Sequence, residues 1–230
     1  MPLLRNKFPE LPPTPYGELR PQLRSGDVLL CSGTGVFSTL IQRATRSVWS
    51  HVGLILRVDS IDRVMLLESL EPIGVRTVRL SKYLTDYDNR GNPYPGRLAV
   101  IRHREISEKV AGRGQTGTPH SSDTPLDTRH SSFVTQMAAA AVDRFGYPYD
   151  KEQIAIIAAR IVSNRLRFSK KERDRLDRPN AYICSEYVAL CFQEIGIDIP
   201  WDKKGFIAPA DFACADCFEL TATLQTPSPR

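Results

Sequence analysis

Short runs of aliphatic and β-branched residues, separated by turn-forming residues, dominate the first hundred positions of the chain. Runs of this length and composition are typical of β-strands. They predict strands over residues 26–31, 51–58, 63–70, 74–80 and 97–102. Between the first two strands the apolar residues recur at helical spacing, which predicts a short helix over residues 36–46.

The second half of the chain shows helical periodicity instead. Helices are predicted over about residues 133–145, from about residue 151 onward, and over residues 184–195. The last of these ends at Gly196 and has one apolar stripe, formed by Val188, Cys191, Phe192 and Ile195. Strands followed by helices predict an α+β fold, in which a small antiparallel sheet packs against a helical subdomain.

The two strands over 51–58 and 63–70 have the pattern of an antiparallel hairpin. If Ser60 and Ile61 form a two-residue turn, facing residues have numbers that sum to 121, so that Gly53 faces Glu68. Alternate residues share a face, which puts His51 and Glu68 on one side, diagonal to each other and within reach. A slip of one residue would separate them.

Polar and Pro-rich segments divide the chain into a single domain and its appendages. Residues 1–24 are predicted to be a Pro-rich N-terminal extension, and residues 221–230 a C-terminal tail. Residues 107–132 are rich in Ser, Thr, Gly and Pro, which predicts a flexible insertion within a domain that covers 25–220. His120 and His130 lie in this insertion and are expected to be solvated.

The composition is that of an ordinary globular domain, with 41% hydrophobic and 25% charged residues in 230. No signal peptide or membrane-spanning run is visible, so we expect a soluble, cytoplasmic protein. The five cysteines have no regular spacing and fit a reducing compartment better than a disulfide framework.

The net charge of +5 is a mild bias, and no nucleic-acid-binding motif accompanies it. The basic segment over 165–178 is expected to be a solvated surface, and a surface that faces an anionic partner is the alternative.

Cys184 is the strongest candidate for chemistry. It lies where the chain enters a helix, and the partial positive charge there favours a thiolate. The unpaired backbone N–H groups of that turn could also hold an oxyanion. Among the four histidines, His51 is the best partner, and Glu68 could fix its tautomer. Each residue alone would more often be structural, so the hypothesis depends on the combination.

Other polar residues have simpler interpretations. Cys214 and Cys217 have the spacing of a redox or zinc pair, but no second pair follows, so packing is expected. Asp27 is expected in a turn or cap. Glu186 is expected to complement the helix dipole, with contact to substrate as the alternative.

The segments Trp49-Ser-His-Val-Gly-Leu-Ile55 and Tyr182-Ile-Cys-Ser-Glu-Tyr-Val188, with Glu68 between them, resemble the permuted branch of NlpC-type papain-like cysteine hydrolases, the YiiX-like group. In papain the cysteine precedes the histidine, whereas in this branch the order is reversed, as it is here. The Gly26-Asp27 strand, Gly146–Asp150 and Ile207–Asp211 also look like that group, so the resemblance covers roughly residues 25 to 215.

The resemblance implies a circularly permuted papain-like fold with catalytic residues Cys184, His51 and Glu68. Tyr182 would line the oxyanion or substrate side, although a buried ring with a satisfied hydroxyl is an equal alternative. No metal and no organic cofactor is implied. The implied activity is a thiol hydrolase that cleaves an amide bond through an acyl-enzyme.

A peptide, a peptidoglycan-like molecule and an acyl lipid are all candidate substrates. One alternative is a lipid acyl hydrolase or acyltransferase of the lecithin-retinol-acyltransferase-like kind, in which a second histidine typically stands where this chain has Glu68. The other alternative is a catalytically silent binding module. The sequence leaves the substrate and the oligomeric state open.

Overall fold

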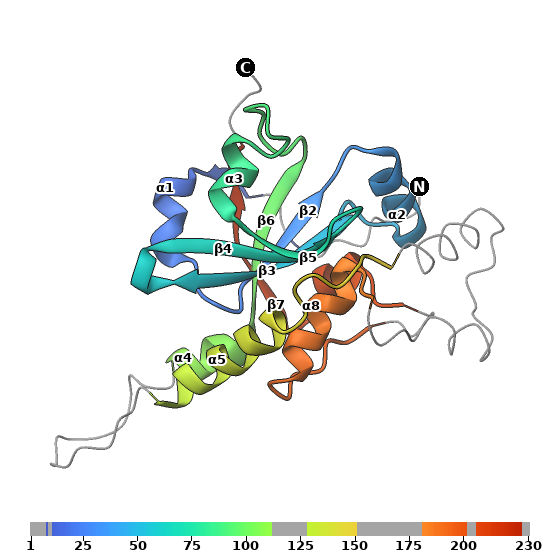
Figure 1. Ribbon diagram of the computed structural model, residues 1–230. Helices are drawn as coiled ribbons and strands as arrows, with labels where there is room; N and C mark the ends of the chain where they lie inside the picture. Colours follow the sequence, from blue (N-terminus) through green and yellow to red (C-terminus); the bar gives the residue numbers. More distant parts are fainter. Residues whose placement is uncertain (1–7, 9–10, 112–127, 151–180, 202–205, 227–230) are drawn as a thin grey trace, which may run out of the picture.

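Strands from both ends of the chain join in one sheet. The computed structural model describes residues 8, 11–111, 128–150, 181–201 and 206–226. These residues form a seven-stranded sheet of order β1-β7-β6-β2-β3-β4-β5 (Figure 1). The strands are β1 (Pro13–Thr14), β2 (Val28–Ser32), β3 (His51–Val58), β4 (Arg63–Leu70), β5 (Gly74–Arg79), β6 (Arg97–His103) and β7 (Phe218–Leu224). Neighbouring strands are antiparallel, except that β1 and β7 are parallel.

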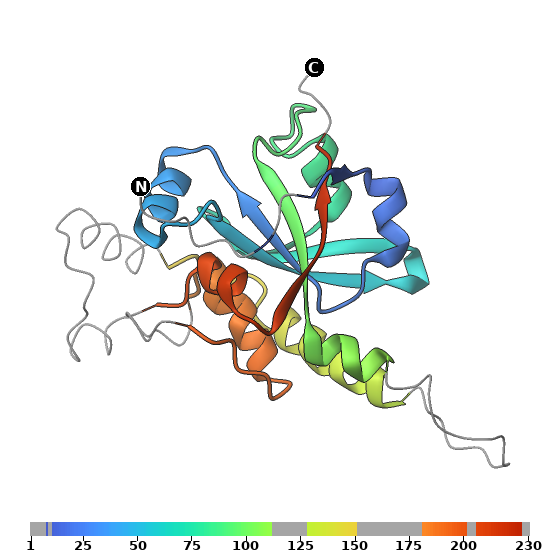
Figure 2. The ribbon, with the colours of Figure 1, turned by 180° about the vertical axis from the view of Figure 1, so that it is seen from behind.

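Helices cover both faces of this sheet (Figures 1 and 2). The described helices are α1 (Tyr16–Leu19), η1 (Arg20–Gln22), α2 (Val36–Thr45), η2 (Asp59–Ile61), α3 (Leu80–Thr85), α4 (Arg104–Ala111), α5 (Thr128–Val142), α8 (Cys184–Gln193) and α9 (Pro209–Cys214). Helices α5, α8 and α9 pack on one face and α1 and α3 on the other, so the architecture is α+β.

The alternation of side chains along β3 divides the core into two layers. Val52 and Leu54 pack in the cluster that contains α8, whereas Ile55 packs in the cluster that contains Tyr83 of α3. Because both faces are covered, the central strands are apolar nearly throughout rather than alternating with polar residues. The predicted apolar stripe is confirmed, because Val188, Cys191 and Phe192 of α8 are buried. Ile195 is buried too, but it follows the helix, which ends at Gln193 rather than at residue 195.

The predicted register of the β3–β4 hairpin is confirmed. Leu54 faces Leu67 and Val58 faces Arg63, so the numbers of facing residues sum to 121. The connection differs from the expected two-residue turn, because η2 and a left-handed Asp62 with φ 48 make a longer loop. That loop is centred on the same two residues, and this is why the register is unchanged.

The boundaries of the predicted appendages are corrected at both ends of the domain. Strand β1 pairs with β7, and Leu19 and Leu23 are both 1% exposed, so part of the expected extension 1–24 belongs to the folded core. Strand β7 likewise runs to Leu224, into the expected tail 221–230. The two segments stabilise each other by pairing across the length of the chain, which no local pattern reveals.

The expected insertion over 107–132 is shorter in the structure. Helix α4 continues to Ala111, and α5 begins at Thr128 rather than at residue 133, so that it includes His130. His120, the helix predicted from residue 151 and the basic segment 165–178 lie outside the described residues. None of the described helices is long and apolar enough to cross a membrane.

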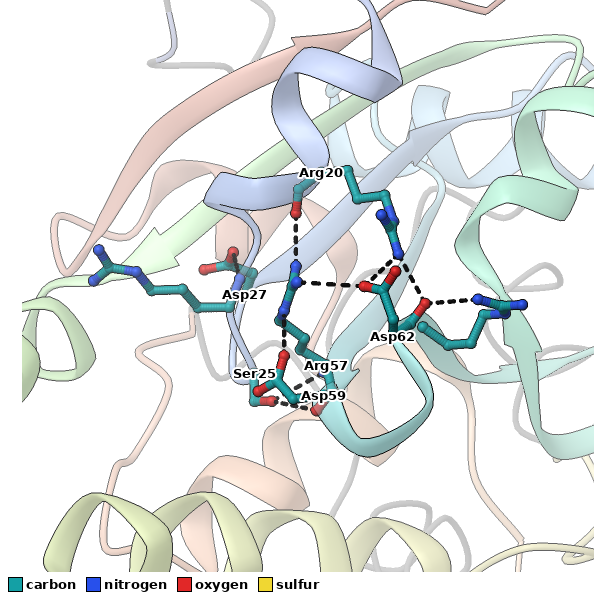
Figure 3. A network of polar contacts seen from close by, with 8 residues as sticks. Arg20, Ser25, Asp27, Arg57, Asp59 and Asp62 are labelled. Carbon is teal, nitrogen blue, oxygen red and sulfur yellow. Dashed lines mark hydrogen bonds and ion pairs between the residues drawn. The ribbon is translucent and has the colours of Figure 1, made fainter. Parts of the chain in front are cut away.

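Asp27 is buried at the start of β2, where it joins a turn to the sheet (Figure 3). Its carboxylate accepts a hydrogen bond from the backbone N–H of Arg24 at 2.8 Å. It also accepts two from the guanidinium of Arg102, at 2.6 and 2.8 Å. The turn role expected for Asp27 is therefore present, together with an ion pair from Asp27, the residue before β2, to Arg102 of β6 that the sequence did not indicate.

Replacing Asp27 should destabilise the fold strongly. Asp27→Ala leaves the guanidinium of Arg102, which is 14% exposed, without its partner, and we expect the free energy of unfolding to fall by about 3 kcal/mol in urea titrations. Glu219→Ala is the control, because it breaks an exposed pair with Arg104 and should cost less than about 1 kcal/mol. Equal losses in the two variants would contradict a stabilising role for the buried pair.

Candidate active site

Cys184 is the first residue of α8, and its side chain is buried. The preceding residue, Ile183, has an extended backbone and no polar side-chain atom, so it cannot cap the N–H groups of the first turn. The approach to the helix is held in place by Tyr182, whose carbonyl accepts a 2.7 Å hydrogen bond from Ser69 of β4. Tyr182 also forms a bridge with Tyr149. The start of the helix is therefore anchored to the sheet.

His51 is the first residue of β3, and its ring lies beside the carboxylate of Glu68. The Nε2 atom of His51 is 2.7 Å from Oε2 of Glu68, as the hairpin register predicts. The side chain of His51 is 12% exposed and that of Glu68 is fully buried. A hydrogen bond and the charge of Cys184 also act on His51, so the structure brings all three predicted residues together.

Two further residues hold Glu68, and sequence reasoning missed both. Arg76 stands directly opposite Glu68 in the β4–β5 pairing, and its Nε and terminal nitrogen lie 2.9 and 2.7 Å from Oε1. The hydroxyl of Tyr83, from α3, donates a hydrogen bond to Oε2. The register of β4 and β5 could have indicated Arg76, but nothing local to the sequence places α3 over Glu68.

These contacts keep Glu68 ionised although it is buried. Burial alone would raise the pKa of Glu68, but the hydrogen bond and charge of His51, the charge of Arg76 and the hydroxyl of Tyr83 lower it below its ordinary value. Conversely, burial and the nearby carboxylate raise the pKa of Tyr83 well above its ordinary value. Tyr83 therefore stays protonated and remains a donor.

His51 is strongly favoured in its protonated form. Burial lowers the pKa of His51, but the charge and hydrogen bond of Cys184, followed by those of Glu68, raise it to about 10. Because Nε2 is engaged with Glu68, Nδ1 is the ring nitrogen left to face the sulfur of Cys184. The carboxylate of Glu68 and the side chain of Cys184 therefore both contact the imidazole of His51.

The site forms where the two layers of the core meet. Alternation along β3 places His51 on the side of Ile55, in the layer of Tyr83, whereas Cys184 belongs to the opposite layer with α8. His51 stands at the very end of its strand, so its ring links Glu68 on one face to Cys184 on the other.

The ring of Tyr182 belongs to a cavity between α5 and α8. This cavity of about 630 Å³ is also lined by Tyr147, Arg144 and Glu194. The ring of Tyr182 lies 6.0 Å from that of Tyr147, and the guanidinium of Arg144 lies 6.0 Å from its centre. An oxyanion role for Tyr182 stays a prediction.

The remaining cysteines are buried or half-buried. All five cysteines are free thiols, and Cys214 and Cys217 are half-buried. Burial raises the pKa of Cys191 to about 12 and that of Cys31 well above its ordinary value. Glu186 is half-buried in the first turn of α8, where its charge complements the helix dipole.

Comparison with known proteins supports the fold more than the chemistry. No protein-family model and no curated protein matches the sequence. The structure is similar to the crystal structure of the metalloprotein yiiX from Escherichia coli O157:H7, with a TM-score of 0.53 and 15% sequence identity. The similarity covers 90% of this chain and 98% of that one. The chain therefore has a YiiX-like fold.

The described residues of the candidate site do not form a set of ligands for a metal ion. Within the ranges that the structure describes, no group of three or more His, Cys, Asp or Glu side chains could hold one. The carboxylate of Glu68 accepts hydrogen bonds at both oxygens, from Arg76 at one and from Tyr83 and His51 at the other. Its lone pairs are thus directed at protons rather than at an open coordination position.

The protonation of His51 provides a test of this geometry. We expect the Cε1 resonance of His51 to titrate near pH 10 in NMR spectra, and Glu68→Gln to lower that pKa because the carboxylate charge is removed. Since folding raises the pKa of His51 above its ordinary 6.5, its contribution to stability is complete below pH 6.5 and is lost as the pH rises through about 10. Glu219→Gln, at an exposed position, is the control. A midpoint near 6.5 in the unsubstituted protein would refute the proposed electrostatics.

Proposed function

We propose that this protein is a thiol hydrolase of the permuted papain-like kind, which cleaves an amide bond through an acyl-enzyme. One observation supports the proposal above all others: Glu68, held by Arg76 and Tyr83, bonds the ring of His51, which in turn bonds Cys184 at a helix N-terminus. Nucleophile, base and orienting group stand in the order that thiol catalysis needs.

In the proposed reaction, the sulfur of Cys184 attacks the carbonyl carbon of the amide. The carbonyl oxygen becomes negative and is stabilised by the N–H groups of the first turn of α8, which the side chain of Ile183 cannot cap. His51 then gives its proton to the leaving amine, and a thioester remains on Cys184. Water, deprotonated by His51, attacks the thioester carbonyl, the C–S bond breaks, and the acyl group leaves as a carboxylic acid. The thiolate of Cys184 and the protonated ring of His51 are thereby restored.

The charge state of His51 prepares the first step. A protonated imidazole beside a cysteine favours the thiolate, which is the nucleophilic form. The pKa of His51, raised to about 10, keeps the ring protonated at neutral pH, and the ionised Glu68 keeps it oriented. In this mechanism Arg76 and Tyr83 are positioning residues, because they act on the reaction only through Glu68.

The proposed substrate is a peptide or a peptidoglycan-like peptide. The proposed steps need neither a metal nor an organic cofactor. A lipid ester would form the same kind of thioester on Cys184. Because the mechanism does not distinguish the two substrate classes, they are separated by assay.

Purified protein should release amine from peptide amides in a thiol-dependent reaction. We expect Cys184→Ala to lower the rate about a thousandfold or more, because the acyl-enzyme cannot form. Cys214→Ala is the matched control, since Cys214 is a half-buried free thiol that has no part in the mechanism, and it should keep the activity. Peptidoglycan-derived peptides and phospholipid esters are assayed in parallel.

The outcomes separate the candidate functions. If the protein cleaved only phospholipid esters, the proposed amidase activity would be rejected in favour of a lipid acyl hydrolase or acyltransferase. If Cys184→Ala equals the unsubstituted protein on every substrate, the hydrolase is refuted and a silent binding module remains.

The positioning residues should affect turnover more than substrate binding. Tyr83→Phe removes one hydrogen bond to Glu68, and we expect kcat to fall about tenfold with KM nearly unchanged, because the loss concerns the orientation of His51. The pH profile should shift as well. Tyr87→Phe, at a ring that packs against Tyr83, is the control. A fall in stability with an unaltered pH profile would indicate a structural role alone.

A further inference from the structure

Arginines gather at the tip of the β3–β4 hairpin, far along the strands from His51. The carboxylate of Asp62 accepts an ion pair from Arg20 at 2.6 Å, and the guanidinium of Arg57 lies 3.7 Å from the same oxygen (Figure 3). The hydrogen bond of Arg20, with the charges of Arg57 and Arg63, lowers the pKa of Asp62. Asp62 is therefore an anion surrounded by cations.

Two of these cations share a single acceptor. The terminal nitrogens of Arg20 and Arg63 both donate to the backbone carbonyl of Asp62, each at 2.8 Å. Two like charges are thus held close together at the loop. Asp59, which pairs with Arg57 at 2.6 Å, supplies the second carboxylate of the cluster.

A cavity of about 330 Å³ opens beside this cluster. It is lined by Tyr16, Arg20, Asp62, Arg63, Val64, Arg79 and Ser81. Arg79 is exposed, and its guanidinium has no hydrogen-bond or ion-pair partner among the described residues. Three of the lining side chains are guanidinium groups, those of Arg20, Arg63 and Arg79, and one is the carboxylate of Asp62. The cavity wall therefore carries an excess of two positive charges and two hydroxyl-bearing side chains.

We propose that this cavity binds the phosphate group of a phosphate monoester. Guanidinium groups match phosphate oxygens in geometry and charge, and hydroxyl groups add further donors. The excess of two positive charges matches a phosphate dianion better than a carboxylate. The volume lies at the small end of the range for ligand sites, about 300 to 1,000 Å³, which suits a small polar group.

This anion site is separate from the candidate active site. It lies at the turn of the hairpin, whereas His51 and Glu68 lie at the opposite end of β3 and β4. Phosphate binding in this cavity does not depend on the proposed hydrolase chemistry. If no phosphate bound, the proposal for Cys184 and His51 would be unaffected.

Part of the cluster also has a structural task, and the test avoids it. Arg20 and Arg57 tie the N-terminal segment to the hairpin, since Arg57 donates to the carbonyl of Arg20 at 2.9 Å and Arg20 to that of Asp62. Among the described residues, Arg63 donates only to carbonyls of its own loop, and Arg79 has no hydrogen-bond partner. Arg63 and Arg79 can therefore be replaced with little effect on folding.

The test is titration of the 230-residue chain with inorganic phosphate, followed by NMR and compared with chloride at equal ionic strength. We expect shifts at residues around the cavity, and we expect Arg79→Gln and Arg63→Gln each to raise the Kd for phosphate about tenfold through loss of one charge-assisted contact. Arg43→Gln, at an exposed position on α2, should leave the Kd unchanged. Circular dichroism melts of each variant report whether the fold is kept.

Two further arms distinguish the source of the phosphate. Glycerol 3-phosphate tests a soluble monoester, and phosphatidylcholine vesicles with phosphatidic acid test a lipid headgroup. Whichever binds more tightly than inorganic phosphate, and loses that binding in Arg79→Gln, identifies the source. The proposal is overturned if phosphate causes no shifts at the cavity, or if folded Arg79→Gln and Arg63→Gln bind phosphate and vesicles as the unsubstituted protein does.

Discussion

The buried carboxylate of Glu68 is the interaction on which the rest of the site depends. An ionised group without access to water is tolerated only if its oxygens are fully paired, and here Arg76, Tyr83 and His51 supply the pairing. Each partner comes from a different element, so β3, β4, β5 and α3 must all be in place before the charge is stabilised. In return, the carboxylate fixes the ring of His51.

The same geometry explains how a two-layered core can hold one site. Apolar residues of the sheet separate the layer of α8 from the layer of α3. The series of polar contacts from Glu68 through His51 to Cys184 passes from one layer to the other where a strand ends. His51 occupies such a position at the start of β3. Cys184, at the start of α8, meets the ring from the other side, where the polarity of the helix end suits a negative charge.

The two ends of the β3–β4 hairpin show contrasting uses of arginine. At one end a single guanidinium is matched to one buried carboxylate, which produces rigidity and orientation. At the other end, guanidinium groups outnumber carboxylates beside an open cavity, which favours an outside anion. Burial and the balance of charge, rather than residue type, separate the positioning role proposed for Arg76 from the binding role proposed for Arg79.

The sequence by itself determined the features that depend on local periodicity. The alternation of β3 and β4 and the length of their connection predicted that His51 and Glu68 share a face, and the apolar stripe of α8 predicted where that helix packs. Only the tertiary structure decided the contacts between distant segments. Tyr83 reaches Glu68, Arg102 reaches Asp27 and β1 pairs with β7 because the fold brings them together, and periodicity carries no information on which distant elements become neighbours.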